Sequence, residues 1–223
     1  MTDIYGTPEK VRMKAQLFRI AVEALKKEGW EVEKVPGSGK SSVRRITKGG
    51  QSKVVSIRTS QDTWIAFPRT EGDKSWRTLD EVDAVVPVSV DDREKPRFAK
   101  VHLIDGNEVR ARFNRAYEAR KKAGHVIPIG RGVWVSLYNS DAHEPVSHVG
   151  AGMGLKFLPI ATVPLSSDHI VSATAAGSED RHDDRGGNKA LIDEAPLSIA
   201  EAKRRLAITL GVDPANIKIT VEA

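Results

Sequence analysis

The hydrophobic positions near the start of the chain repeat with the period of a helix. Between residues 8 and 28, apolar side chains recur at alternating steps of four and three, which places them on one face of an amphipathic helix. Thr7 followed by Pro8 is typical of a helix start, and Gly29 is typical of the residue just after a helix end. The pattern predicts a helix over residues 8–28 with this stripe on its buried side: Val11, Ala15, Phe18, Val22 and Leu25.

The next part of the chain alternates between apolar and polar residues, which is the period of a β-strand. Such segments lie at residues 30–35, 42–47 and 53–69, with turn residues between them. Within the last segment, Ser60 to Asp62 separates two strands. Because all of these connections have hairpin length, we expect an antiparallel meander that packs on the helix.

The first strand of the segment at residues 53–69 has two chemically different faces. One face carries the apolar Val55 and Ile57. The opposite face carries Ser56 and Arg58, which puts a hydroxyl and a guanidinium side by side. This pair is the starting point for the functional prediction.

Further elements follow with similar signals. We predict strands at residues 82–90, 98–104 and 132–138, and a second helix at residues 107–123. The chain therefore has an α/β fold, α+β in detail: a mixed, mostly antiparallel sheet flanked by helices, with a small C-terminal helix–strand appendage. The apolar residues on the inner side of the second helix are Val109, Phe113, Ala116 and Tyr117.

The pattern changes after the main domain, which we place at residues 1–139. Residues 140–195 show no clear period, and we expect an irregular segment there with a flexible linker at residues 173–189. Residues 196–223 again carry a capping box, an apolar stripe and a terminal strand pattern. Because one helix and one strand cannot bury a core alone, this C-terminal module is expected to dock on the main domain, on its own copy or on another protein.

The composition excludes several kinds of site and indicates the cellular compartment of the protein. The chain has 223 residues, a formal net charge of +5 and no cysteine. The missing cysteines exclude a disulfide frame, a thiolate metal site and a cysteine nucleophile. No apolar run approaches the roughly 18 residues of a membrane span, and the start of the chain lacks a signal-peptide pattern. We therefore expect a cytoplasmic protein that does not contact membranes.

The placement of positive charge indicates a polyanionic partner. Residues 34–61 contain no Asp or Glu, and such a single-sign run is typical of a nucleic-acid site, although lysines also protect edge strands from aggregation. The second helix has many basic residues and only two acidic residues, Glu108 and Glu118. The basic residues are Lys34, Lys40, Arg44, Arg45, Lys48, Lys53 and Arg58 in the run, and Arg110, Arg112, Arg115, Arg120, Lys121 and Lys122 on the helix.

Common catalytic and nucleotide-binding motifs do not fit. The loop at residues 37–41 lacks the first glycine of a phosphate-binding loop and precedes a strand pattern, so a hairpin turn explains its glycines. The six histidines show no metal-ligand spacing, and no G-x-S-x-G motif is present. Trp76, in a polar stretch, is either a loop anchor or a ring on which a base stacks.

The chain begins with a helix, continues with strands and reaches a strand that ends in Arg58, Thr59 and Ser60. This order of elements resembles the restriction-endonuclease-like, PD-(D/E)XK, fold over roughly the first 140 residues. That family holds a divalent cation with an Asp on one strand and a Glu/Gln-x-Lys on the next, since Mg²⁺ prefers carboxylate oxygens. Here Arg58 keeps the positive charge, but Ser56 replaces the acid and the strand at residues 42–47 has no Asp.

An arginine is a poor proton shuttle and a good phosphate clamp. The resemblance therefore implies a nuclease-like domain at residues 1–139 that binds nucleic acid without cutting it, in a context such as phage defence.

We predict a non-catalytic protein that binds duplex DNA and needs no cofactor. One alternative is a Mg²⁺-dependent endonuclease with displaced ligands. A second alternative is a protein-interaction subunit or homo-oligomer that docks through residues 196–223. The displaced ligands would come from Glu23, Asp62, Glu71 and Asp73. The predicted phosphate contacts are Lys40, Arg44, Arg45, Lys48, Arg58, Arg69, Arg110, Arg112, Arg115 and Arg120.

Overall fold

The structure, a computed structural model, places the predicted main domain and part of the segment that follows it. Backbone contacts divide the chain into residues 1–186 and 187–223, and every described residue belongs to the first unit. The predicted linker at residues 173–189 and the predicted module at residues 196–223 lie outside the described residues. The described residues are 7–36, 41–70, 72 and 74–165.

Local signals set the starts of both long helices. The Thr7 side chain accepts a hydrogen bond from the Lys10 amide at 3.4 Å, and the Asp105 side chain accepts one from the Asn107 amide at 2.8 Å. The elements, in chain order, are α1 (Pro8–Lys27), β1 (Glu31–Lys34), β2 (Val43–Lys48), β3 (Gln51–Ser60), β4 (Trp64–Pro68), η1 (Leu79–Glu81), β5 (Ala84–Val90), β6 (Phe98–Val101), β7 (Ile104–Asp105), α2 (Gly106–Lys122), β8 (Gly132–Ser136), η2 (Val146–His148), α3 (Met153–Lys156) and β9 (Ala161–Pro164).

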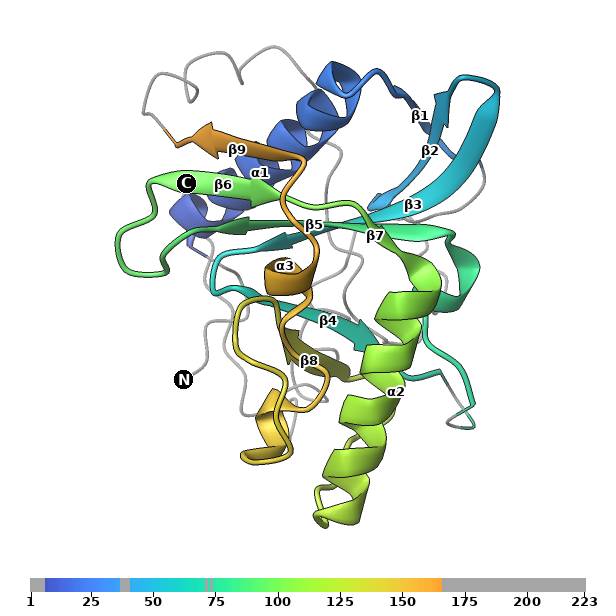
Figure 1. The fold of residues 1–223 in the computed structure, drawn as a ribbon, viewed down its shortest axis with the longest axis vertical. Coiled ribbons are helices and arrows are strands. Elements are labelled where there is room, and N and C mark those ends of the chain that lie inside the picture. The colour runs from blue at the N-terminus through green and yellow to red at the C-terminus, as the bar shows by residue number, and fades with distance from the viewer. Residues whose placement is uncertain (1–6, 37–40, 71, 73, 166–223) are drawn as a thin grey trace, which may run out of the picture. The chain divides into compact units, whose positions relative to one another are not determined.

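The main sheet has seven strands in the order β1-β2-β3-β5-β6-β9, with β7 paired to β5 off this path. β3 and β5 run parallel, and the other neighbours run antiparallel. α1 packs on one face of this sheet, whereas α2 and the two-stranded sheet β4–β8 pack on the other (Figure 1). The prediction of a mixed, mostly antiparallel sheet flanked by helices is therefore confirmed.

The expected continuation of the meander from β3 to β4 is wrong. β4 leaves the main sheet and pairs antiparallel with β8, from Trp64 opposite Ser136 to Pro68 opposite Gly132. The reason is that both edges of β3 are already occupied, one by β2 and the other by β5. The chain reverses at Thr63, whose φ of 68° is rarely adopted by a residue other than glycine.

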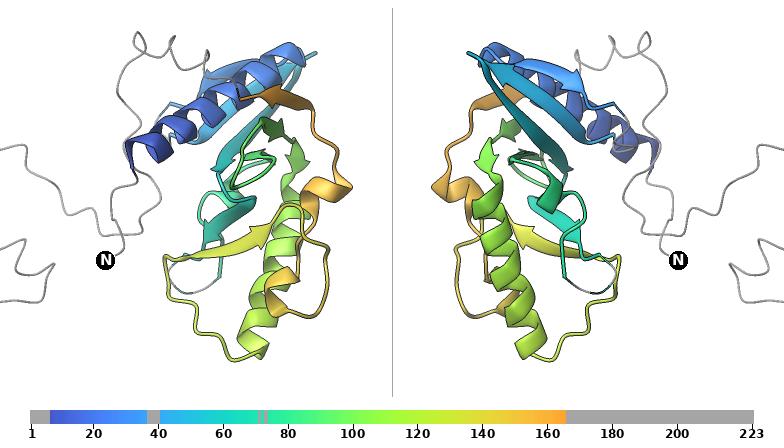
Figure 2. Two further views of the ribbon diagram at one scale, coloured as in Figure 1. Left: turned by 90° about the vertical axis from the view of Figure 1, so that its left-hand side faces the viewer. Right: turned by 90° about the vertical axis from the view of Figure 1, so that its right-hand side faces the viewer.

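The predicted helix over residues 8–28 is present as α1, but its buried face differs from the predicted stripe. Val11 is 58% exposed and Ala15 is also exposed, because the first part of α1 extends beyond the strands (Figure 2). The later turns of the helix form the contact with the sheet. The buried residues of α1 are Leu17, Ile20, Ala21, Ala24 and Leu25.

Aromatic rings hold the second layer of the fold together. Phe113 of α2 makes edge-to-face contacts with Phe67 of β4, at 5.2 Å between ring centroids, and with Trp76, at 5.5 Å. Trp76 is buried, and its indole N–H donates to Asn114 Oδ1 at 2.7 Å. Trp76 is therefore a loop anchor, which was one of the two predictions for this residue.

The ordered fold extends beyond the boundary predicted at residue 139. η2 and α3 follow β8, and β9 then pairs antiparallel with β6 at the edge of the main sheet, from Phe98 opposite Pro164 to Val101 opposite Ala161. The segment at residues 140–165 gives a weak sequence signal because its elements are only three or four residues long.

We expect Leu17→Ala to lower the free energy of unfolding by about 2–5 kcal/mol, because Leu17 is fully buried against the main sheet. Val11→Ala is the matched control on the same helix and should change it by less than about 0.5 kcal/mol. Urea denaturation followed by circular dichroism measures both values. A larger loss for Val11→Ala than for Leu17→Ala would contradict this assignment of the buried face.

Candidate nucleic-acid interface

The predicted contacts on β2 differ in whether solvent can reach them. Arg44 is only 8% exposed; its guanidinium donates to the Ser41 and Val43 carbonyls and lies 4.8 Å from the centre of the Phe18 ring. Arg45, on the opposite face of the strand, is exposed. Lys48 is also exposed, and its ammonium donates to a carbonyl at the end of α1. Lys40 lies outside the described residues.

The Ser56–Arg58 pair points into the space between the two layers. Arg58 is half-buried, with its guanidinium 4.3 Å from the centre of the Phe67 ring. Ser56 is fully buried, and its hydroxyl has no hydrogen-bond partner among the described residues. The two side chains therefore share a face, as predicted, but that face is covered by β4.

Of the proposed displaced metal ligands, the two within the described residues, Glu23 and Asp62, each interact with other groups. Glu23 is exposed and pairs with Lys26 at 3.3 Å. Asp62 accepts hydrogen bonds from the Ser60 hydroxyl and the Trp64 amide. Within the described ranges no group of three His, Asp or Glu side chains could hold a metal ion. Glu71 and Asp73 lie outside the described residues.

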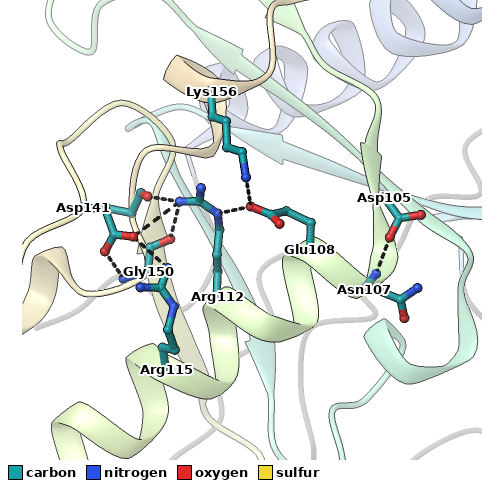
Figure 3. Close-up of polar contacts among 9 residues, drawn as sticks. Asp105, Asn107, Glu108, Arg112, Arg115, Asp141, Gly150 and Lys156 are labelled. Carbon is teal, nitrogen blue, oxygen red and sulfur yellow. Dashed lines mark hydrogen bonds and ion pairs between the residues drawn. The ribbon is translucent and has the colours of Figure 1, made fainter.

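Two arginines at the first half of α2 hold neighbouring segments in place. The Arg112 guanidinium is buried, donates to Glu108 at 2.8 Å, and also donates to the carbonyls of Gly150 and Ala151 (Figure 3). Arg110 donates to the carbonyls at both ends of η1, at 2.7 Å and 3.1 Å. These hydrogen bonds tie both arginine side chains to neighbouring segments of the fold.

Asp141 completes this network from the segment after β8. It accepts hydrogen bonds from Arg115 at 2.7 Å and from the Gly150 amide at 2.9 Å (Figure 3). Burial alone would raise the pKa of Asp141, but the hydrogen bonds from Arg115 and Gly150 outweigh it and hold the pKa below its usual range. Hydrogen bonds from Arg112 and Lys156 likewise lower the pKa of Glu108.

The last turn of α2 and the loop after it gather the remaining predicted contacts. Arg69 is buried, and its guanidinium lies 4.7 Å from the centre of the Trp76 ring and 4.8 Å from the centre of the Tyr117 ring. The Lys121 ammonium lies 5.1 Å from the centre of the same Tyr117 ring. Arg120 donates to the Trp134 carbonyl on β8, and burial lowers the pKa of its guanidinium.

We name this region the helix-end cluster. Its exposed members include cations and an indole that is 52% exposed. A hydrogen bond from the Gly130 amide to the Arg69 carbonyl ties the residue after β4 to the loop before β8. The cluster consists of Arg69, Arg120, Lys121, Lys122, Arg131 and Trp134.

Sequence reasoning placed Arg69 and Arg120 among the phosphate contacts and counted Lys121 and Lys122 in the basic surface of the second helix, but it did not include the exposed Arg131. A sequence signal for it exists, since residues 119–140 contain no Asp or Glu. This second acid-free stretch is difficult to recognise in the sequence because it is distributed over a helix, a loop and a strand. It also carries exposed apolar side chains, with Val126 90% exposed and Ile129 60% exposed.

The two groups of exposed basic residues do not form one surface. The hairpin of β2 and β3, which carries Arg45 and Lys48, and the C-terminal end of α2 lie at opposite ends of the fold (Figure 1). Of these two groups, the helix-end cluster also includes the exposed ring of Trp134, which projects from the face of β8 opposite to the one that α2 covers.

A buried polar chain joins the main sheet to the segment after β8. His102 Nδ1 donates to the Phe157 carbonyl at 2.8 Å, and Nε2 lies 2.9 Å from the Tyr138 hydroxyl. Tyr138 in turn lies 3.1 Å from the Ser89 hydroxyl. Burial lowers the pKa of His102 and raises that of Tyr138. Because His102 and Ser89 are fully buried, we interpret this chain as a packing element.

We expect Arg112→Met to lower the free energy of unfolding by about 2–4 kcal/mol, since the Gly150 and Ala151 carbonyls would lose their donor in a buried place. Arg115→Met is the control, because the Arg115–Asp141 pair is half exposed and is expected to contribute about 1 kcal/mol or less. Urea denaturation measures both, and equal losses would contradict the assignment.

We expect the free energy of unfolding to fall as the pH drops below about 6.5, the usual pKa of histidine. The folded-state pKa of His102 is below this value, so the unfolded chain binds the proton more tightly and protonation favours unfolding. His102→Gln should flatten this dependence between about pH 7.5 and 5.5. The exposed His125→Gln variant should keep it, and identical pH profiles for all three proteins would rule out a role for His102.

No described helix is both long and apolar enough to cross a membrane. No family model matches the chain, and comparisons with curated proteins and with solved structures found no match either. The assignment of a function therefore depends on the helix-end cluster itself.

Proposed function

We propose that this chain binds nucleic acid, duplex DNA being the first form to test, and that it does so without cutting the strand. The observation that carries the proposal is the helix-end cluster. Lys121, Lys122 and Arg131 are exposed within a stretch, residues 119–140, that contains no acidic residue. Phosphate groups are neutralised by such cations, and this sequence-independent attraction supplies most of non-specific DNA affinity.

The surroundings of the cluster support phosphate contact in two ways. Arg69 adds a permanently charged guanidinium beneath the surface, held by Trp76 and Tyr117. Lys121 is positioned against the same Tyr117 ring, which limits the freedom of a long side chain that binding would otherwise have to restrict.

The non-catalytic part of the proposal rests on the Ser56–Arg58 pair. In the PD-(D/E)XK family, which the chain resembles in element order, an acid occupies the position of Ser56. Ser56 cannot ligate a metal as a carboxylate does, and Arg58 packs on Phe67. The same pair argues against a Mg²⁺-dependent nuclease that holds its metal in the way of the PD-(D/E)XK family. The alternative of a protein partner concerns residues 196–223 of this chain, which lie outside the described residues.

We expect the wild-type protein to bind a labelled DNA duplex without metal, with an affinity that falls steeply as salt rises. Lys121→Glu with Lys122→Glu should make the slope of log affinity against log salt shallower by about two, one for each lost phosphate contact. Fluorescence anisotropy over a salt series measures both quantities.

The matched control reverses two lysines in the last turn of the other long helix, Lys26→Glu with Lys27→Glu. This pair changes the net charge and the helix terminus equally, so a purely global charge effect would weaken binding by the same amount in both variants. Equal weakening would contradict a site at the helix-end cluster. Cleavage of the duplex when Mg²⁺ is added would contradict the non-catalytic assignment.

A further inference from the structure

His102, which follows β6 directly, is fully buried, and it is the only buried histidine among the described residues. Its Nδ1 lies 2.8 Å from the Phe157 carbonyl oxygen, which can only accept a hydrogen bond, so Nδ1 carries the proton of the neutral ring. Nε2 must then accept, and its donor is the Tyr138 hydroxyl at 2.9 Å. The neutral form of His102 therefore has a partner for each ring nitrogen.

Both partners of the His102 ring belong to one segment, residues 137–160, which links β8 to β9 and runs from the second layer to the edge of the main sheet (Figure 1). We name it the latch segment. Its helices, η2 and α3, are only three and four residues long. The Arg112 side chain holds its middle through the Gly150 and Ala151 carbonyls. A segment built from such short elements can open locally while the rest of a domain stays folded.

A positive charge on the His102 ring would meet another positive charge instead of an acid. Burial lowers the pKa of His102, the bond to the Phe157 carbonyl raises it in part, and the charge of Lys100 lowers it further. Asp91, after β5, is bound to backbone amides of its own hairpin. The other charged or titratable groups described on the elements around the ring are Tyr138, Lys156 and its partner Glu108, and Arg112.

The hydrogen bonds of the ring can survive protonation, but the charge cannot be balanced in place. With a second proton, Nε2 becomes a donor and the Tyr138 oxygen must accept from it. Tyr138 can then donate to the Ser89 oxygen at 3.1 Å, and Ser89 can donate to the Val90 carbonyl at 3.2 Å. What remains is a buried cation near Lys100, and access to water relieves the cost of such a charge.

We propose that the latch segment is a pH-sensitive device: it closes over neutral His102 and opens locally when solvent delivers a second proton to the ring, while the main sheet stays folded. The proton adds to Nε2, and opening lets water surround the charge. The device does not depend on nucleic-acid binding. It also goes beyond the expected loss of global stability, because the opening concerns one segment.

The size of the effect follows from the pKa of an exposed histidine, about 6.5. In the closed state the ring stays neutral because its pKa lies below this value, whereas in the open state it binds the proton as an ordinary histidine does. The ratio of open to closed molecules should therefore rise by up to about tenfold when the pH falls from about 7.5 to about 5.5.

Hydrogen exchange of the full chain, followed by mass spectrometry at both pH values and corrected for the intrinsic exchange rate, measures this ratio. We expect the rise in peptides from the latch segment, where the Gly152 and Gly154 amides donate to the Ser136 and Leu137 carbonyls. The matched control is the pair β1–β2 at the opposite edge of the main sheet. Its local opening leaves His102 buried and should not change with pH.

Three variants locate the proton. His102→Gln keeps a side chain that can donate and accept but cannot take up the proton, so the rise should disappear. His125→Gln removes an exposed histidine and should leave the rise unchanged. Tyr138→Phe removes the hydroxyl that donates to Nε2, so the segment should open more at both pH values and keep the rise. Should His102→Gln not fold, the wild-type rise compared with the β1–β2 control still decides.

Two results would overturn the latch. One is a latch segment that exchanges with the same opening free energy as Ala21 and Leu25, buried in α1, at both pH values, because the segment then opens only with the whole domain. The other is an equal rise in the wild type and in His102→Gln. A failure to bind nucleic acid would remove the proposed function and leave the latch untouched.

Discussion

The parallel pairing of β3 with β5 is the constraint on which the rest of the structure depends. Parallel neighbours cannot be joined by a hairpin, so the chain after Ser60 has to return across one face of the sheet before β5 begins at Ala84. β4 and η1 lie on this return path, and β4 takes its own partner, β8. The second layer, with its aromatic contacts to α2, follows from this crossover.

The crossover also decides which positive charges reach solvent. β4 covers the face that Ser56 and Arg58 share, so the guanidinium of Arg58 lies against the Phe67 ring. The first half of α2 lies against η1 and the segment after β8, where carbonyl groups accept from Arg110 and Arg112. The end of α2 extends past the strands (Figure 1), and there Lys121 and Lys122 stay exposed.

Elements with local sequence signals could be predicted from the sequence. Features that depend on contacts between residues far apart in the chain could not. Asp105 and the apolar spacing of α2 are enough to predict that helix. Arg112 and Arg115 lie three residues apart and look equivalent in sequence, yet one is buried and the other half exposed. What separates them is the position of Gly150, which no local pattern specifies. The partner of β4 is likewise a strand beyond α2 in the sequence.

The exposure of Trp134 follows from how closely β4 and β8 approach. A Cβ atom at position 132 would come within 2.8 Å of the Ala66 Cβ, so a larger residue there would push the strands apart. Pairing with β8 is what keeps β4 in the second layer, and it therefore requires a glycine beside the indole. A glycine has no side chain with which to cover the ring. The same close approach that closes the small sheet thus leaves the Trp134 ring exposed on the face of β8 that points away from α2.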